Sequence, residues 1–141
     1  MFRTATVLAA LTLVAGPAFA AEPGSDASVS LTFETASDTG AVMVALYDQT
    51  TYGGGQPIRA ARIDVTTGER SVTFTDLPAG EYGVKAFHDV NGNGRMDTNP
   101  FGMPTEPFAF SNNARGNMGP AGWDRARFTV AGTTSQIISI R

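Results

Sequence analysis

The residues most able to do chemistry lie in the stretch DVNGNGRMD, residues 89–97. Asp89, Asn91 and Asn93 alternate, Gly94 follows, and Asp97 comes three residues later. In a loop of this kind the side-chain oxygens at positions 1, 3, 5 and 9 can converge on one hard cation, and glycine at position 6 permits the sharp turn. Calcium prefers such carboxylate, amide and carbonyl oxygens. The spacing therefore predicts a Ca²⁺ loop.

The remaining ligands must come from the backbone and from outside the loop. Arg95, at position 7, can offer its carbonyl oxygen. Position 12 is Pro100, where an EF-hand has glutamate, and no helical pattern flanks the loop, so an EF-hand is not expected. Glu106 is the nearest candidate for the last ligand. With only two charged ligands in the loop, we expect weak binding, with a dissociation constant on the order of 0.1 to 1 mM.

A metal-free turn explains part of the same pattern. Asn-Gly-Asn-Gly suits backbone positions with positive φ, and Asp89 and Asp97 can fix backbone N–H groups with their side chains. A plain turn, however, does not require a second carboxylate at position 9. That second carboxylate favours calcium. Magnesium is less favoured, because it usually takes few carboxylates together with waters or phosphates.

A second candidate site lies in the strand-poor segment 99–125. Loops of this length in compact domains are usually functional, self-packed or disordered, and the apolar content of this one argues against disorder. We expect it to be ordered and to fold over one end of the domain. The side chains that suit a glycan or another small ligand are Phe108, Phe110, Asn112, Asn113 and Trp123. The alternative, which we favour, is that the aromatic residues pack the loop onto its own domain.

A hydrolase is the third interpretation. His88 is the only histidine, it adjoins Asp89, and Ser111 lies in the neighbouring segment. Strand alternation places His88 on the inward face and Asp89 on the other, so the two side chains do not meet. We therefore expect a packed, hydrogen-bonded histidine, and no catalytic residue is assigned. Zinc is not expected, because the chain has one histidine and no cysteine.

The elements that must position these residues are strands. Apolar residues alternate with polar ones in most of the chain after residue 26, with turns rich in Gly, Asp and Thr between. This pattern predicts an all-β, Greek-key sandwich of about seven strands, immunoglobulin-like or prealbumin-like. The turn Leu77-Pro78-Ala79-Gly80 precedes Tyr82, which could form a tyrosine corner by bonding back to the turn.

The first twenty residues have the features of a secretory signal peptide. Arg3 precedes an apolar stretch, which ends in Gly16-Pro17 and small residues up to Ala20. We expect cleavage after Ala20, a single domain over residues 21–141, no membrane span in the mature form, and a periplasmic or extracellular location. The signal removes one of ten basic residues against thirteen acidic ones, so the mature net charge is −4. This charge argues against a nucleic-acid partner.

Two motifs carry a family resemblance. FHDVNGNGRMDTN spans residues 87–99 and PFAFSNNA spans residues 107–114, and GAVMVALYD and LPAGEY add to them. The chain resembles a bacterial family of secreted domains of unknown function with this FHDxNGNGxxDTN signature. The resemblance implies a small prealbumin-like sandwich and no assigned activity. Residues 89–97 alone are also similar to calcium loops of bacterial adhesin modules, a likeness at the level of the fold.

Three functions therefore stay open. The first is a secreted, calcium-stabilised binding or accessory module with an unknown protein or glycan partner. The second is a glycan or small-ligand binder that uses segment 99–125. The third, and the least favoured, is a hydrolase built around His88.

Overall fold

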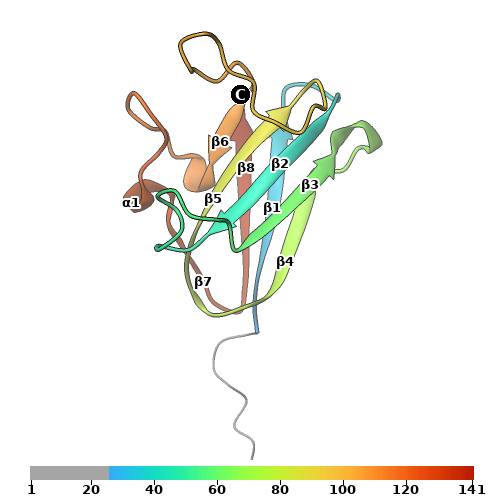
Figure 1. Cartoon of the computed structure of the whole chain (residues 1–141). Coiled ribbons are helices and arrows are strands. Elements are labelled where there is room, and N and C mark those ends of the chain that lie inside the picture. Colours follow the sequence, from blue (N-terminus) through green and yellow to red (C-terminus); the bar gives the residue numbers. More distant parts are fainter. Residues whose placement is uncertain (1–25) are drawn as a thin grey trace, which may run out of the picture.

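The computed structural model describes residues 26–141, which form two β-sheets packed face to face (Figure 1). The predicted signal peptide, residues 1–20, and the start of the mature chain at Ala21 lie outside the described residues. The strands are β1 (Ala27–Thr35), β2 (Ala41–Tyr47), β3 (Arg59–Asp64), β4 (Ser71–Leu77), β5 (Gly80–Asp89), β6 (Phe108–Phe110), β7 (Phe128–Val130) and β8 (Thr133–Ile140). One short helix, α1 (Trp123–Ala126), and two 3₁₀ turns, Val65–Thr67 and Ser111–Asn113, complete the described elements.

The all-β sandwich is confirmed, with eight strands in place of about seven. The additional strand is β6, which pairs with β5 through Phe108, Ala109 and Phe110. Three residues are too short to display a clear period of two, so this strand left no alternating signal in the sequence.

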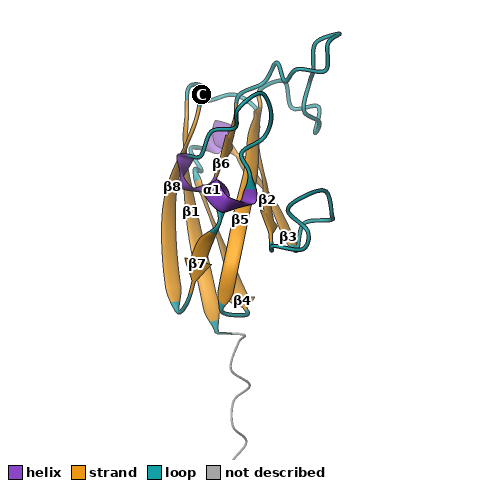
Figure 2. Cartoon of the chain, turned by 90° about the vertical axis from the view of Figure 1, so that its left-hand side faces the viewer, coloured by secondary structure: helices purple, strands orange, loops and turns teal. Residues whose placement is uncertain are grey.

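The two sheets differ in their pairing. One has the strand order β4-β1-β8, in which β1 runs antiparallel to β4 and parallel to β8. The other has the order β3-β2-β5-β6, all antiparallel, and β7 pairs with the first residues of β5. Figure 2 shows the sandwich edge-on, with loops projecting on the side of β2 and β3, away from β1 and β8.

The core fills the space between the sheets with the side chains that alternation placed inward. Its fully buried members include Val29, Leu31, Phe33, Val42, Leu46, Val84, Ile138 and Ile140. The tyrosine corner is confirmed as well. The hydroxyl of Tyr82 donates to the carbonyl oxygen of Pro78 at 2.5 Å, which ties the start of β5 to its preceding turn.

Segment 99–125 differs from the expected cap over one end. It contains β6, a 3₁₀ turn and α1, and several of its residues line the outer face of the sheet β3-β2-β5-β6. Phe110 is buried in a second apolar cluster, whose other buried members are Tyr52, Ala121 and Ala126. Phe101 and Phe108 are exposed, so the expectation that the aromatic residues of this segment pack onto the domain is wrong for these two. Met103 and Met118 are exposed as well. Among the described residues, no helix is long and apolar enough to cross a membrane.

Candidate functional site

Asp89 begins the candidate calcium loop as the last residue of β5, and it is fully buried. Its carboxylate accepts two backbone N–H groups, from Asn93 at 3.2 Å and from Gly94 at 2.7 Å. These bonds curl the chain back over the end of the strand. Gly94 has φ of 79°, the left-handed conformation that the metal-loop spacing requires at this position.

The two asparagines complete the turn with local hydrogen bonds. Asn91 Oδ1 accepts the N–H of Asn93 at 3.2 Å, and Asn93 Oδ1 accepts the N–H of Arg95 at 2.9 Å. Because Asp89 Oδ1 and Asn91 Oδ1 bond the same backbone nitrogen, these two oxygens lie close together. A carboxylate or amide oxygen that accepts one hydrogen bond still has a free lone pair, so both of these oxygens can also ligate a cation.

Asp97 is held differently from Asp89. Its two carboxylate oxygens accept the side-chain amides of Asn91 at 2.5 Å and of Asn93 at 2.8 Å. Within residues 26–141, no backbone N–H donates to this carboxylate. The turn's backbone is therefore fixed by Asp89 and the two asparagines, and Asp97 faces their side chains across the loop.

Glu106 lies beside the loop, where it was predicted to supply the last ligand. It is buried, and its two oxygens accept the backbone N–H groups of Val90 at 3.1 Å and of Asp97 at 3.2 Å. These residues mark the entrance and the exit of the loop. Glu106 thus acts as a clamp that holds the two ends of the loop together.

A metal at this loop would depend on few charged ligands. In the described part of the chain, no three acidic, histidine or cysteine side chains form a metal-binding group. The donors that the loop offers are therefore the two carboxylates of Asp89 and Asp97, the amide oxygens of Asn91 and Asn93, and the carbonyl of the exposed Arg95. This set is oxygen-only, as calcium requires.

The hydrolase residues have structural partners. His88 is buried, and its Nε2 lies 2.6 Å from the carbonyl oxygen of Thr39. Ser111 is also buried. Its hydroxyl donates to the carbonyl oxygen of Ala126 and accepts the backbone N–H of Val84. No hydrogen bond joins His88 to Ser111 in the described chain, so these residues do not form a Ser-His-Asp triad.

The candidate ligand residues of segment 99–125 fall into an aromatic group and a pair of asparagines. Phe110 and Trp123 belong to the same apolar cluster as Tyr52. Phe108 and Phe110 lie edge to face, with ring centroids 5.9 Å apart. Asn112 donates to the carbonyl oxygens of Arg125 and Arg127, and Asn113 bonds the backbone of β8 at Ile137 and Ser139. Trp123 packs on Tyr52, with ring centroids 5.5 Å apart.

An apolar groove, which no local pattern in the sequence predicted, lies over the outer face of the sheet β3-β2-β5-β6. Its volume is about 1210 Å³. The strand register places two rows of outward side chains on its floor. One row is Arg62, Met43, Phe87 and Phe108. The next is Ala60, Ala45, Lys85 and Phe110. The walls come from two loops, through Met96, Met103, Pro104, Met118 and Pro120.

Lys85 and Tyr47, which line the groove, belong to an aromatic cluster. The ammonium of Lys85 lies 4.8 Å and 4.3 Å from the ring centroids of Tyr47 and Tyr52, and it donates to the carbonyl oxygen of Tyr52 at 2.6 Å. A Cβ atom on Gly83 would lie 2.9 Å from the Tyr52 ring and 3.2 Å from Trp123. Glycine is thus required there for the cluster to pack against β5.

Ionisation of Tyr52 is expected to lower the free energy of unfolding at alkaline pH. Burial, with a smaller contribution from Tyr47, raises the pKa of Tyr52 from 10.0 to about 12. The unfolded chain therefore loses this proton first, so the stabilisation is complete below pH 10 and is lost as pH rises towards 12. The loss should reach roughly 2 to 3 kcal/mol. Denaturant unfolding of Tyr52→Phe beside the natural protein measures it.

The variant also removes the hydrogen bond from the Tyr52 hydroxyl to the carbonyl oxygen of Ala121, so it should be about 1 kcal/mol less stable at neutral pH. Burial also lowers the pKa of Lys85, which makes stability rise with pH just below the ordinary lysine value. This opposite contribution is present in both proteins and cancels in their difference. A difference that stays constant from pH 9 to 12 would contradict the assignment.

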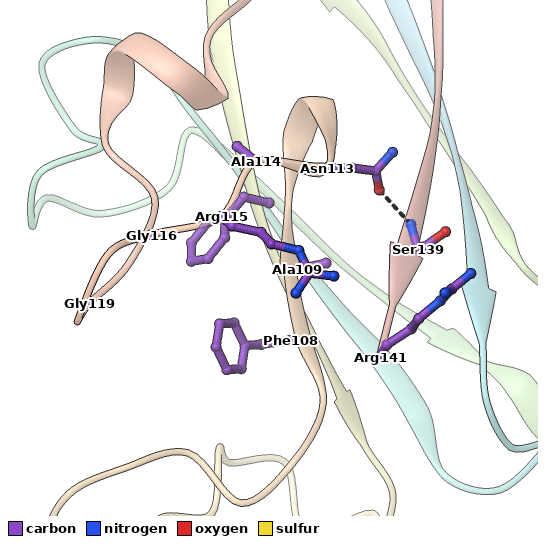
Figure 3. Close-up of a pocket in the computed structure, with 10 residues that line it drawn as sticks. Phe108, Ala109, Asn113, Ala114, Arg115, Gly116, Gly119, Ser139 and Arg141 are labelled. Atoms are coloured by element: carbon purple, nitrogen blue, oxygen red, sulfur yellow. Dashed lines mark hydrogen bonds between the residues drawn. The ribbon is translucent and has the colours of Figure 1, made fainter.

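A smaller pocket of about 380 Å³ adjoins the groove across Phe108. Figure 3 shows it between β6, the chain at residues 114–119 and the end of β8. Arg115 and Arg141 both line it, and Asn113 Oδ1 accepts the backbone N–H of Ser139 at 2.8 Å on its wall. Its lining contains no acidic residue.

The comparisons with known proteins identify the family. A family described as an uncharacterized protein conserved in bacteria (DUF2141) matches residues 33–138, from β1 to β8. The chain belongs to this family. The predicted bacterial domain of unknown function is therefore confirmed, while the signature motif and secretion stay predictions. No curated protein and no solved structure matched the sequence.

Proposed function

We propose that the protein is a secreted, calcium-stabilised binding module. The observation that carries the calcium assignment is the position of Asp97. Its carboxylate is not used to fix the backbone of the turn, and it faces Asn91 and Asn93, whose partners are otherwise local. A cation between Asp89 and Asp97 would take the place of the two amide contacts and would neutralise charge at a turn that needs only one carboxylate for its shape.

The loop also has a place in the binding surface. Residues 89–106 contribute Met96, Met103 and Pro104 to the wall of the apolar groove. Glu106 clamps the base of this segment, so an ion that rigidifies the loop would also hold the groove wall in place. Calcium would thus stabilise a surface rather than perform chemistry. A ligand at the groove accounts for why so much apolar surface is exposed.

Calcium is expected to raise the melting temperature. At about 1 mM free Ca²⁺ and a dissociation constant of about 0.1 mM, binding to the native state alone adds roughly 1.4 kcal/mol. For a domain of this size the melting temperature should rise by about 3 to 6 °C. Differential scanning calorimetry in calcium and in chelator measures the shift, and calorimetric titration of the chelator-treated protein measures the affinity.

The variant that tests the site is Asp97→Asn. It removes the charge and leaves the backbone bonds of the turn in place, so the melting temperature in chelator should change little while the calcium-dependent rise disappears. Asp124→Asn is the matched control, because Asp124 is exposed in α1, outside the loop. A folded natural protein with the same melting temperature in calcium and in chelator would defeat the calcium assignment.

A further inference from the structure

The groove over the outer face of the sheet β3-β2-β5-β6 has the lining of a ligand site and, at about 1210 Å³, is somewhat larger than most. Ligand pockets are typically about 300 to 1,000 Å³ and mostly apolar, with a few placed polar groups. Four of the five methionines of the chain line this groove: Met43, Met96, Met103 and Met118. Methionine side chains are flexible and polarizable, and they adapt to apolar ligands of varied shape.

The groove also has a definite charge. Arg62 and Lys85 are its only charged lining residues, although acidic residues outnumber basic ones in the chain, thirteen to ten. The ion pairs found within residues 26–141 are Arg70 with Asp38 and Arg127 with Glu81, so neither cation of the groove forms a close ion pair there. Arg62 has an acidic neighbour in Asp64, whose pKa is lowered mainly by hydrogen bonds from Thr66 and further by the charge of Arg62. The adjoining pocket adds Arg115. The linings of the groove and of this pocket contain no acidic side chain, which favours an anion.

Lys85 is the cation of the groove best placed to bind such an anion. One of its three donors is used by the carbonyl oxygen of Tyr52, and the ammonium also lies over the rings of Tyr47 and Tyr52, so no charged group is bonded to it. Burial lowers the pKa of Lys85, so its charge is held in a partly desolvated place without a carboxylate to compensate it. A bound anion would supply the missing partner.

The shape of the floor separates an apolar part from the cationic part. Met43, Phe87 and Phe108 form one row, while the next row drops to small side chains at Ala45 and Ala60 before it reaches Lys85. The result is a hollow over the two alanines, bordered by Arg62 and Lys85, that opens onto an aromatic and methionine-lined strip.

We propose that the groove binds an amphiphile with a carboxylate head and an unbranched alkyl chain. The head contacts Lys85 and Arg62 above the two alanines, and the chain lies along Met43, Phe87 and Phe108. This assignment rests on the proposed role as a binding module, and the contacts it names involve none of the candidate calcium ligands.

A second copy of the chain fits the groove less well. A two-fold dimer would place the same surface on both sides of the interface. The interface would then contain Arg62 and Lys85 of both copies and no acidic residue of the groove, and such a concentration of like charge is unfavourable. The same charges attract a carboxylate.

Calorimetric titration of the purified full chain with octanoate, decanoate and dodecanoate, below their micelle concentrations, tests the proposal. Affinity should increase by up to about fourfold for each added methylene. Decyltrimethylammonium has an alkyl chain of the same length with a cationic head, and it should bind at least about tenfold more weakly than decanoate. Each titration is run in calcium and in chelator, so that a failure of the calcium site and a failure of the groove are seen separately.

Three variants locate the ligand. Ala60→Phe fills the hollow on an exposed strand position and should abolish decanoate binding in a protein that stays folded. Arg62→Gln removes one head contact at the surface and should weaken decanoate about threefold, with little effect on decanol. Arg59→Gln is the matched control, because Arg59 is exposed on the same strand and does not line the groove. It should bind as the natural protein does.

The outcomes decide for or against the carboxylate amphiphile. Chain-length dependence, preference for the anionic head and loss of binding in Ala60→Phe together support it. Equal binding of decanoate and decyltrimethylammonium would overturn it, as would undiminished binding in Ala60→Phe. Sedimentation that shows a dimer abolished by Ala60→Phe would assign the groove to a second copy and overturn it as well.

Discussion

Replacing Gly40 by alanine is expected to lower the free energy of unfolding by about 3 to 5 kcal/mol. Gly40 precedes β2 and has φ of 72°. A Cβ atom there would lie 2.0 Å from the carbonyl oxygen of Asp89 and 2.8 Å from that of Val90. These are backbone atoms at the start of the candidate calcium loop, so neither can move aside without displacing the loop. Chemical denaturation monitored by circular dichroism measures the loss.

The matched control is Gly68→Ala. Gly68 has φ of 88°, but a Cβ atom there would have no neighbour within 4 Å. This variant carries only the cost of the left-handed conformation, roughly 1 to 2 kcal/mol. If the two variants lost the same stability, the contact between Gly40 and the loop would have no energetic weight and only the backbone conformation would matter.

Replacing Glu106 by alanine is expected to cost about 2 to 4 kcal/mol. The variant leaves the backbone N–H groups of Val90 and Asp97 without their acceptor. Glu106→Gln keeps one acceptor oxygen and should recover about half of the loss. Hydrogen exchange gives the local measurement, since the amides of Val90 and Asp97 should exchange faster than in the natural protein.

Glu69→Ala provides the comparison for a glutamate whose side chain is exposed. Glu69 lies in the turn before β4, and its replacement should change stability by no more than about 0.5 kcal/mol. Unchanged exchange at Val90 and Asp97 in Glu106→Ala would mean that other groups hold the ends of the loop, and the clamp would be wrong.

Alternation in the sequence predicted the sandwich because inward and outward positions differ strongly in most strands. Val29, Leu31 and Phe33 are buried between less buried neighbours, as their pattern required. The same pattern contains no information about partners, so the parallel pairing of β1 with β8 could not be predicted from it. That pairing depends on contacts between distant parts of the chain.

The candidate calcium loop and the groove differ in how far the sequence could reveal them. The loop is local, so the positions of Asp89, Asn91, Asn93 and Asp97 were readable from spacing alone. The groove brings together residues from four strands and two loops. One signal was present: β2 is apolar at every position from Ala41 to Tyr47, which indicates a strand with apolar neighbours on both faces.

The role of Glu106 as a clamp could be predicted only in part from the sequence. Its closeness to the loop followed from sequence distance, but its role did not, because a carboxylate that binds backbone N–H groups has the same spacing as one that binds a cation. The aromatic cluster was hidden for a similar reason. Tyr52 lies in the turn after β2, and only the fold brings it to Gly83 and Trp123.

The central position of β1 between β4 and β8 has a consequence for how the chain folds. Glu34 and Ser139, 105 residues apart, are joined by a side-chain hydrogen bond across the parallel pair. Such high contact order predicts slow folding, on the millisecond to second scale. The sheet β4-β1-β8 cannot be completed before β8 has been synthesised. Until then, one edge of β1 has no paired strand. Truncated chains that end before Thr133, and therefore lack β8, should aggregate through this edge rather than form a smaller stable domain.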